Sequence, residues 1–163
     1  MPDTLTLRID LLGVKPPVTQ TFKVSSDTSM YELHFIIQEV MGWNDCHLSQ
    51  FEVGGSYQEK DWGPLLPRVT GAWTIADTRM VSDEFGDDPI TDVHDVTVGE
   101  AFTDVVGTKI WYKYDFGDGW IHHLELLDRK ETPYKTELLP LVVLGQNACP
   151  PEDCGGHYGY RDL

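Results

Sequence analysis

Two aromatic and β-branched segments separated by Asp118-Gly119 constrain the fold of this chain more than any other feature. The segments run from Lys109 to Phe116 and from Trp120 to Leu127, and their composition is typical of strands. Asp-Gly between two such runs is a strong signal for a two-residue turn that joins antiparallel strands. The sequence therefore predicts a long hairpin in the C-terminal half, and with it an antiparallel sheet.

The predicted turn decides which side chains face each other across this hairpin. With Asp118-Gly119 as the loop, Asp115 lies opposite His122, where it can hydrogen-bond the imidazole and fix its tautomer. Such a pair suits a general base or a residue that orients a metal ligand. It is equally an ordinary structural pair. A three-residue loop, Gly117 to Gly119, would instead place His122 opposite Tyr114.

The N-terminal third predicts two strands that form a hairpin. Apolar residues alternate from Thr4 to Leu12, and a second extended run follows from Val18 to Val24. Lys15-Pro16-Pro17 lies between them and cannot belong to a central strand, because proline lacks the amide hydrogen. A third alternating run, His47 to Val53, predicts another strand further along the chain.

Between these strands, the sequence predicts an amphipathic helix from Met30 to Met41. Ser29 and Glu32 form a capping box at its start, and Gly42 follows its last turn. Apolar residues recur within it at steps of three and four, so that one face packs on a core. Its His34, like His47 after it, is expected to be an ordinary partly buried histidine.

The middle of the chain, from Glu59 to Asp95, has a different character. It contains three prolines, several glycines and the acidic cluster Ser82 to Asp88, which predict an irregular, solvated insertion with a short strand near Ala72 to Thr74. A second capping box at Thr97 predicts a short helix that ends near Val106. We expect residues 1–163 to form a single α+β domain: a mainly antiparallel sheet, a β-β-α-β start, and one or two helices on one face.

Charge and composition exclude some classes of function. The chain has 12 Lys and Arg against 27 Asp and Glu, a net charge of −15, so non-specific nucleic-acid binding is disfavoured. Neither a signal peptide nor an apolar run long enough to cross a bilayer is evident. Three cysteines are too few for a disulfide framework. These observations predict a cytoplasmic protein without a membrane partner.

A second polar cluster, Cys149 to His157, predicts either a zinc site or a stiff turn. Cys149, Cys154 and His157 are potential zinc ligands, and His122 or Cys46 would supply a fourth. Their spacing is wider than in zinc knuckles. The alternative is a proline-stiffened turn whose Glu152-Asp153 pair caps backbone amides. No other cofactor is predicted.

Several motifs together resemble the plasmid pRiA4b Orf-3-like family. They are, in order, Ile36-Ile37-Gln38, Met41-Gly42-Trp43, His47-Leu48 with Phe51, Tyr114 to Asp118 with Trp120 and His122, and Pro150 to Gly156. The resemblance spans nearly the whole chain and implies an α+β fold and an association with mobile elements. Some members carry a transposon-resolvase label, but the few arginines here are scattered and do not suit phosphoryl transfer. Thr19 to Thr21 and Ser49 stand where the family typically has tryptophan with arginines and a second histidine, which weakens a nucleic-acid or metal role.

Two classes of function remain open. The first is a non-enzymatic interaction or ligand-binding domain whose partner is a protein or a small ligand, and this is the leading prediction because the sequence contains no complete catalytic constellation. The second is a metal-dependent hydrolase or nuclease-like enzyme, in which carboxylates favour magnesium or manganese and cysteines favour zinc. The residues predicted to line a common groove are Asp115, Asp118, Trp120, His122, Glu152 and Asp153.

Overall fold

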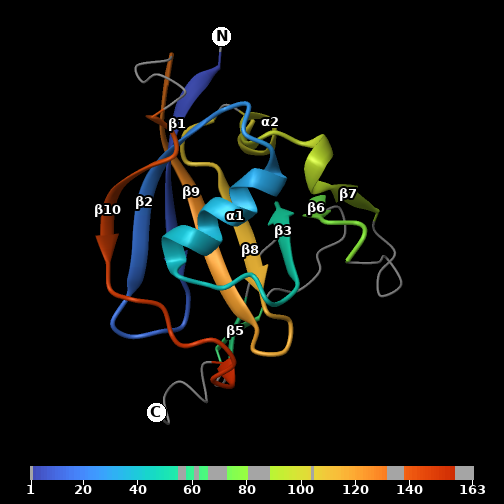
Figure 1. Cartoon of the computed structure of the whole chain (residues 1–163), viewed down its shortest axis with the longest axis vertical. Coiled ribbons are helices and arrows are strands. Elements are labelled where there is room, and N and C mark those ends of the chain that lie inside the picture. The colour runs from blue at the N-terminus through green and yellow to red at the C-terminus, as the bar shows by residue number, and fades with distance from the viewer. Residues whose placement is uncertain are drawn as a thin grey trace.

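The computed structural model describes residues 2–54, 58–60, 63–65, 73–80, 89–103, 105–131 and 138–156 (Figure 1). The elements are β1 (Asp3–Leu11), β2 (Val18–Ser25), α1 (Met30–Met41), β3 (Ser49–Val53), β4 (Gln58–Lys60), β5 (Gly63–Leu65), β6 (Trp73–Ala76), β7 (Ile90–Asp92), the 3₁₀ turn η2 (Val93–Asp95), α2 (Val98–Phe102), β8 (Lys109–Tyr114), β9 (Trp120–Glu131) and β10 (Leu141–Gln146). The β-β-α-β start is as predicted. No described helix has the length and apolar character needed to cross a membrane.

Eight strands form one mixed sheet in the order β10-β2-β1-β9-β8-β3-β6-β7, and α1 lies across one face of it (Figure 1). Only β6 and β7 pair in parallel, and the other neighbours are antiparallel. The sheet is therefore mainly antiparallel, as predicted. It dominates the fold more than predicted, since the described helices are one of 12 residues and one of five.

Helix α1 begins and ends at the predicted residues. The Ser29 side chain accepts a hydrogen bond from the Glu32 amide, and Gly42 has the left-handed backbone that ends a helix (φ 86°). Leu33 and Ile37 are fully buried in the core against the sheet. The buried face of α1 lies over β8 and β9 (Figure 1). The loop that follows α1 lies beside the end of the β8–β9 hairpin, where the Asp115 amide donates to the Leu48 carbonyl.

The β8–β9 hairpin forms, but its predicted register is wrong. Tyr114 pairs with Trp120 and Tyr112 with His122, so the loop is the five-residue segment 115–119. Asp115 builds this loop: its Oδ1 accepts hydrogen bonds from the Gly117 and Asp118 amides, and its own carbonyl accepts one from Gly119. Because Asp115 adopts a left-handed backbone (φ 59°), it leaves the strand and does not face His122.

Three further predictions meet the structure in part. The short strand predicted near Ala72 is β6, which joins β3 in the main sheet, and β7 pairs beside it. The acidic cluster 82–88 lies outside the described residues, so the insertion remains a prediction. Helix α2 ends at Phe102 rather than near Val106, and Thr103, which caps it, has a left-handed backbone. Strand β10, which was not predicted, is an edge strand paired with β2.

Candidate functional site

Asp115, Glu152 and Asp153 of the predicted groove converge, and the residue at their centre is His47. His47 Nε2 lies 2.7 Å from Asp153 Oδ1, 3.4 Å from Asp115 Oδ2 and 3.8 Å from Glu152 Oε2. We call these four residues the His47 cluster. They come from the segment between α1 and β3, from the β8–β9 loop and from the C-terminal turn. With a neutral imidazole, the cluster carries three negative charges.

Asp115 is the buried member of the His47 cluster. Its side chain is only 8% exposed, and its Oδ1 is held by the loop amides described above. Its Oδ2 is buried, points to His47 Nε2, and has no hydrogen-bond partner among the described residues. His47 Nε2 is buried and lacks a hydrogen bond in the same way. Asp115 Oδ2 and His47 Nε2 are therefore close together but not aligned for a hydrogen bond. Buried polar atoms without a hydrogen-bond partner are rare in proteins.

Glu152 is anchored to the aromatic end of β8. Its Oε1 accepts hydrogen bonds from the Asn44 amide at 2.7 Å and from the Tyr114 hydroxyl at 3.0 Å. Burial raises the pKa of Tyr114, and the neighbouring Cys46 and Glu152 raise it further. The hydroxyl therefore stays protonated and donates to Glu152. This contact fixes the C-terminal turn against the sheet and so positions Asp153.

The other predicted groove residues have structural roles. Asp118 Oδ2 accepts a hydrogen bond from the Gly155 amide at 3.2 Å, and its carbonyl is so close to Gly156 that a Cβ there would lie 2.5 Å from the oxygen. Gly156 also has a left-handed backbone (φ 71°), so two constraints favour glycine. Trp120 is fully buried in the core, with its ring 5.8 Å from that of Trp43.

His122 is also a core residue. The Trp43 indole N–H donates to His122 Nε2 at 3.1 Å, and His122 Nδ1 contacts the Tyr112 carbonyl at 3.1 Å. One nitrogen accepts and the other donates, which assigns a neutral imidazole with its proton on Nδ1. Its predicted pairing with Asp115 does not form, because the longer loop shifts the register.

The cysteines predicted as zinc ligands do not gather around His122. In the described ranges, the side chains close enough to share a metal ion include neither Cys149 nor Cys154 nor His122. Burial raises the pKa of Cys149 to about 12, and burial together with Asp118 raises that of Cys154, so both favour the neutral thiol. His157 lies outside the described residues, and the zinc site that includes it remains a prediction.

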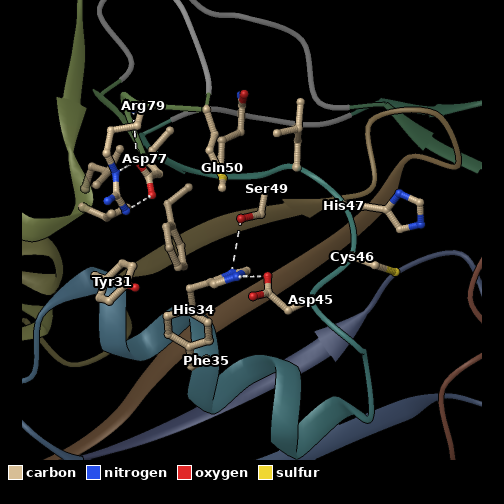
Figure 2. Close-up of a pocket in the computed structure, with 16 residues that line it drawn as sticks. Tyr31, His34, Phe35, Asp45, Cys46, His47, Ser49, Gln50, Asp77 and Arg79 are labelled. Carbon is tan, nitrogen blue, oxygen red and sulfur yellow. Dashed lines mark hydrogen bonds and ion pairs between the residues drawn. The ribbon is translucent and has the colours of Figure 1, made fainter.

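A cavity of about 450 Å³ lies between α1 and strands β3 and β6. Figure 2 shows Tyr31 and Phe35 projecting from α1 along one wall, Asp77 and Arg79 at one end, and His47 at the other. Half of the sixteen lining residues are apolar, namely Tyr31, Phe35, Leu48, Phe51, Ile75, Ala76, Met80 and Val93. The sequence analysis missed this cavity because its walls come from distant segments. The exposed position of Phe35 on α1 was the available signal.

A row of polar side chains, Ser49, His34 and Asp45, lines the cavity (Figure 2). His34 Nε2 lies 2.6 Å from Asp45 Oδ1, and Ser49 Oγ lies 3.2 Å from His34 Nδ1. The order resembles that of a hydrolytic triad. However, the Tyr112 hydroxyl lies closer to the same Nδ1, at 2.7 Å, and receives a hydrogen bond from Gln38. The Tyr112 proton is therefore directed at the lone pair that would activate Ser49.

Comparison with known proteins matches this chain to one family. The family model for plasmid pRiA4b ORF-3-like proteins matches residues 3–163. "Uncharacterized protein y4hQ" of Sinorhizobium fredii (strain NBRC 101917 / NGR234) is 32% identical over 157 residues, which cover 96% of this chain and 69% of the relative. The crystal structure of MM3350 from Methanosarcina mazei Go1, a protein of unknown function, superposes with a TM-score of 0.74 over 99% of this chain and 79% of that one, at 24% identity. That likeness concerns the fold alone.

Proposed function

Since the chain belongs to the plasmid pRiA4b ORF-3-like family, and the names of the two similar proteins above assign no activity, we propose from its own geometry that it is a non-enzymatic ligand-binding domain. The observation that carries the proposal is the cavity between α1, β3 and β6. Its volume, about 450 Å³, falls in the range of small-molecule sites. A cytoplasmic location and an association with mobile elements belong to the same proposal, the latter supported by the family resemblance.

The walls of the cavity suggest the chemistry of the ligand. Aromatic and aliphatic side chains would surround an apolar body, while the His34 and Asp45 pair would meet a polar group at the edge. The charged groups at the other end already satisfy each other, because Arg79 donates to Asp77 from Nε at 3.1 Å and from Nη2 at 2.8 Å. The net charge of −15 repels anions. We therefore propose a neutral or cationic amphipathic ligand, either a small molecule or a peptide side chain.

A matched pair of leucines tests this proposal. Leu48 lines the cavity and is 41% exposed, whereas Leu141 lies on edge strand β10 and is 40% exposed. We expect the neutral fluorophore N-phenyl-1-naphthylamine to bind with saturation at one site. Leu48→Gln should weaken its binding about tenfold, because an apolar contact worth about 1.4 kcal/mol is lost. Leu141→Gln should leave it unchanged.

Two results would reject the cavity as the binding site. One is the absence of saturable binding. The other is equal weakening by the two leucine variants, which would place the probe on general apolar surface rather than between α1 and β3. Circular dichroism melts of both variants show whether they remain folded under the conditions of the titration.

A second candidate function, ester or amide hydrolysis, is favoured only by the row of Ser49, His34 and Asp45. We rank it below binding because the Tyr112 hydroxyl competes for His34 Nδ1. Turnover of p-nitrophenyl butyrate that Ser49→Ala abolishes would reverse this ranking. The other alternative, a metal-dependent hydrolase or nuclease-like enzyme, would require a divalent cation at the His47 cluster.

A further inference from the structure

The His47 cluster has features that hydrogen bonding within the protein does not explain. Three carboxylates from two distant segments lie within 4 Å of one imidazole nitrogen, and the buried atoms Asp115 Oδ2 and His47 Nε2 make no hydrogen bond among the described residues. We propose that His47, Asp115 and Asp153 bind a first-row divalent metal ion such as Zn²⁺ or Mn²⁺. Glu152 lies next to this set and orients it.

The spacing of the ligand atoms fits a shared cation. Ligand bonds of roughly 2.0–2.2 Å place neighbouring donor atoms about 3.0–3.6 Å apart. His47 Nε2 lies 2.7 Å from Asp153 Oδ1 and 3.4 Å from Asp115 Oδ2, and all three atoms lie within 4.8 Å of one another. Small side-chain adjustments are enough to bring each atom into a common coordination shell.

A protonated imidazole explains the cluster less well than a metal ion does. A single N–H at His47 Nε2 can point at only one acceptor, and none of the three carboxylate oxygens is aligned to receive it. A metal cation attracts all three carboxylate oxygens, because its attraction does not require them to align with an N–H bond. Asp115 strengthens the argument, since its side chain is 8% exposed and a buried carboxylate oxygen without a partner is costly.

The donor set and the charge indicate the class of ion. Imidazole nitrogen suits zinc and other first-row transition metals, while carboxylates also suit manganese. A divalent ion would reduce the charge of the cluster from −3 to −1, in a chain whose net charge of −15 concentrates cations around it. The Cys46 thiol lies close enough to His47 and Glu152 to join them in holding a metal ion, and a sulfur ligand would favour zinc.

Bound metal would have a structural consequence. His47 follows α1, Asp115 begins the β8–β9 loop, and Asp153 belongs to the C-terminal turn, so one ion would join three segments of the chain. The inference does not depend on the cavity ligand, because the cation is measured without an apolar probe. His47 lines both sites, whereas Asp115 and Asp153 are absent from the cavity wall.

Isothermal titration of tag-free, EDTA-dialysed protein with Zn²⁺ and, separately, with Mn²⁺ tests the proposal. We expect one ion per chain for at least one of the two metals. His47→Ala should weaken binding at least about tenfold, and so should Asp153→Asn, a variant at a 67% exposed side chain that folding does not require. Added metal should raise the melting temperature of the wild type, and should raise that of these two variants less or not at all.

His94 provides the matched control. It is another histidine beside a carboxylate, with Nδ1 2.5 Å from Asp92 Oδ1, but it is surface-exposed, and the described residues supply no third ligand next to it. His94→Ala should retain the affinity of the wild type. The proposal is overturned if neither metal binds the wild type at a defined stoichiometry, or if binding survives both His47→Ala and Asp153→Asn. Equal weakening by His94→Ala would also overturn it, because it indicates non-specific binding to an acidic surface.

Discussion

His122 and His47 both pack against a tyrosine of β8, with ring centroids 5.2 Å from Tyr112 and 5.8 Å from Tyr114, respectively. Their polar surroundings differ. His122 is fully buried, and its two nitrogens are matched by the Trp43 indole and the Tyr112 carbonyl. His47 Nε2 faces three carboxylates and makes no hydrogen bond in the described part of the chain. Most buried polar groups that serve a fold are hydrogen-bonded locally, so the unsatisfied Nε2 of His47, surrounded by three carboxylates, requires another explanation, for which a bound ion is one candidate.

The largest effect should come from His122→Ala. The substitution leaves a void in the core and removes the partners of the Trp43 indole N–H and the Tyr112 carbonyl. We expect the free energy of unfolding, measured by urea denaturation, to fall by about 3 kcal/mol. His47→Ala in EDTA should cost less than about 1 kcal/mol, because His47 Nε2 makes no hydrogen bond to the described residues. Similar losses for the two variants would contradict the distinction between a structural and a binding histidine.

The next largest effect concerns alkaline pH and compares the tyrosines beside these histidines. Burial raises the pKa of both Tyr112 and Tyr114, so the folded protein keeps protons that the unfolded chain loses above pH 10. Stability should therefore fall as pH rises, by about 1.4 kcal/mol per pH unit for each tyrosine that stays protonated. Tyr114→Phe should make this decline shallower. Urea midpoints between pH 8 and 11 measure it, and equal slopes for variant and wild type would contradict the assignment.

Local sequence signals predicted the elements of the fold well where a single segment contains the information. The capping box at Ser29 and the glycine at position 42 define both ends of α1, and alternation of apolar residues predicts β1 and β2. These features depend on contacts between near neighbours, which the sequence shows directly. The family resemblance, based on motifs in order, is confirmed by the match over residues 3–163.

The hairpin register shows why the site was harder to predict. Asp118-Gly119 is a strong two-residue turn signal, yet the loop has five residues because the Asp115 side chain caps it and the Asp115 amide donates to the Leu48 carbonyl. The hydrogen bond between Asp115 and Leu48 joins residues 67 positions apart, so no periodic pattern in the sequence indicates it. His47 could not be identified for the same reason, since its carboxylate neighbours meet only after the sheet has formed.

Asp115→Asn should change the free energy of unfolding least. The sign of this change distinguishes a metal site from a structural ion pair. The side-chain oxygen of the introduced amide can still accept the hydrogen bonds from the two loop amides. The new NH₂ group can donate to His47 Nε2, whereas the carboxylate oxygen that it replaces repels Asp153 and Glu152. In EDTA we therefore expect a gain of about 1 kcal/mol in the free energy of unfolding, measured by urea denaturation, together with the loss of stabilisation by metal.

Asp118→Asn is the control for this variant, because it removes a charge from the same loop at a side chain whose Oδ2 already accepts from Gly155. It should bring no gain in EDTA and leave the response to metal intact. If Asp115→Asn instead destabilises the protein in EDTA, the carboxylate is stabilised in the fold by a protonated His47. In that case His47, like His122, serves the structure, and the contrast between the two histidines disappears.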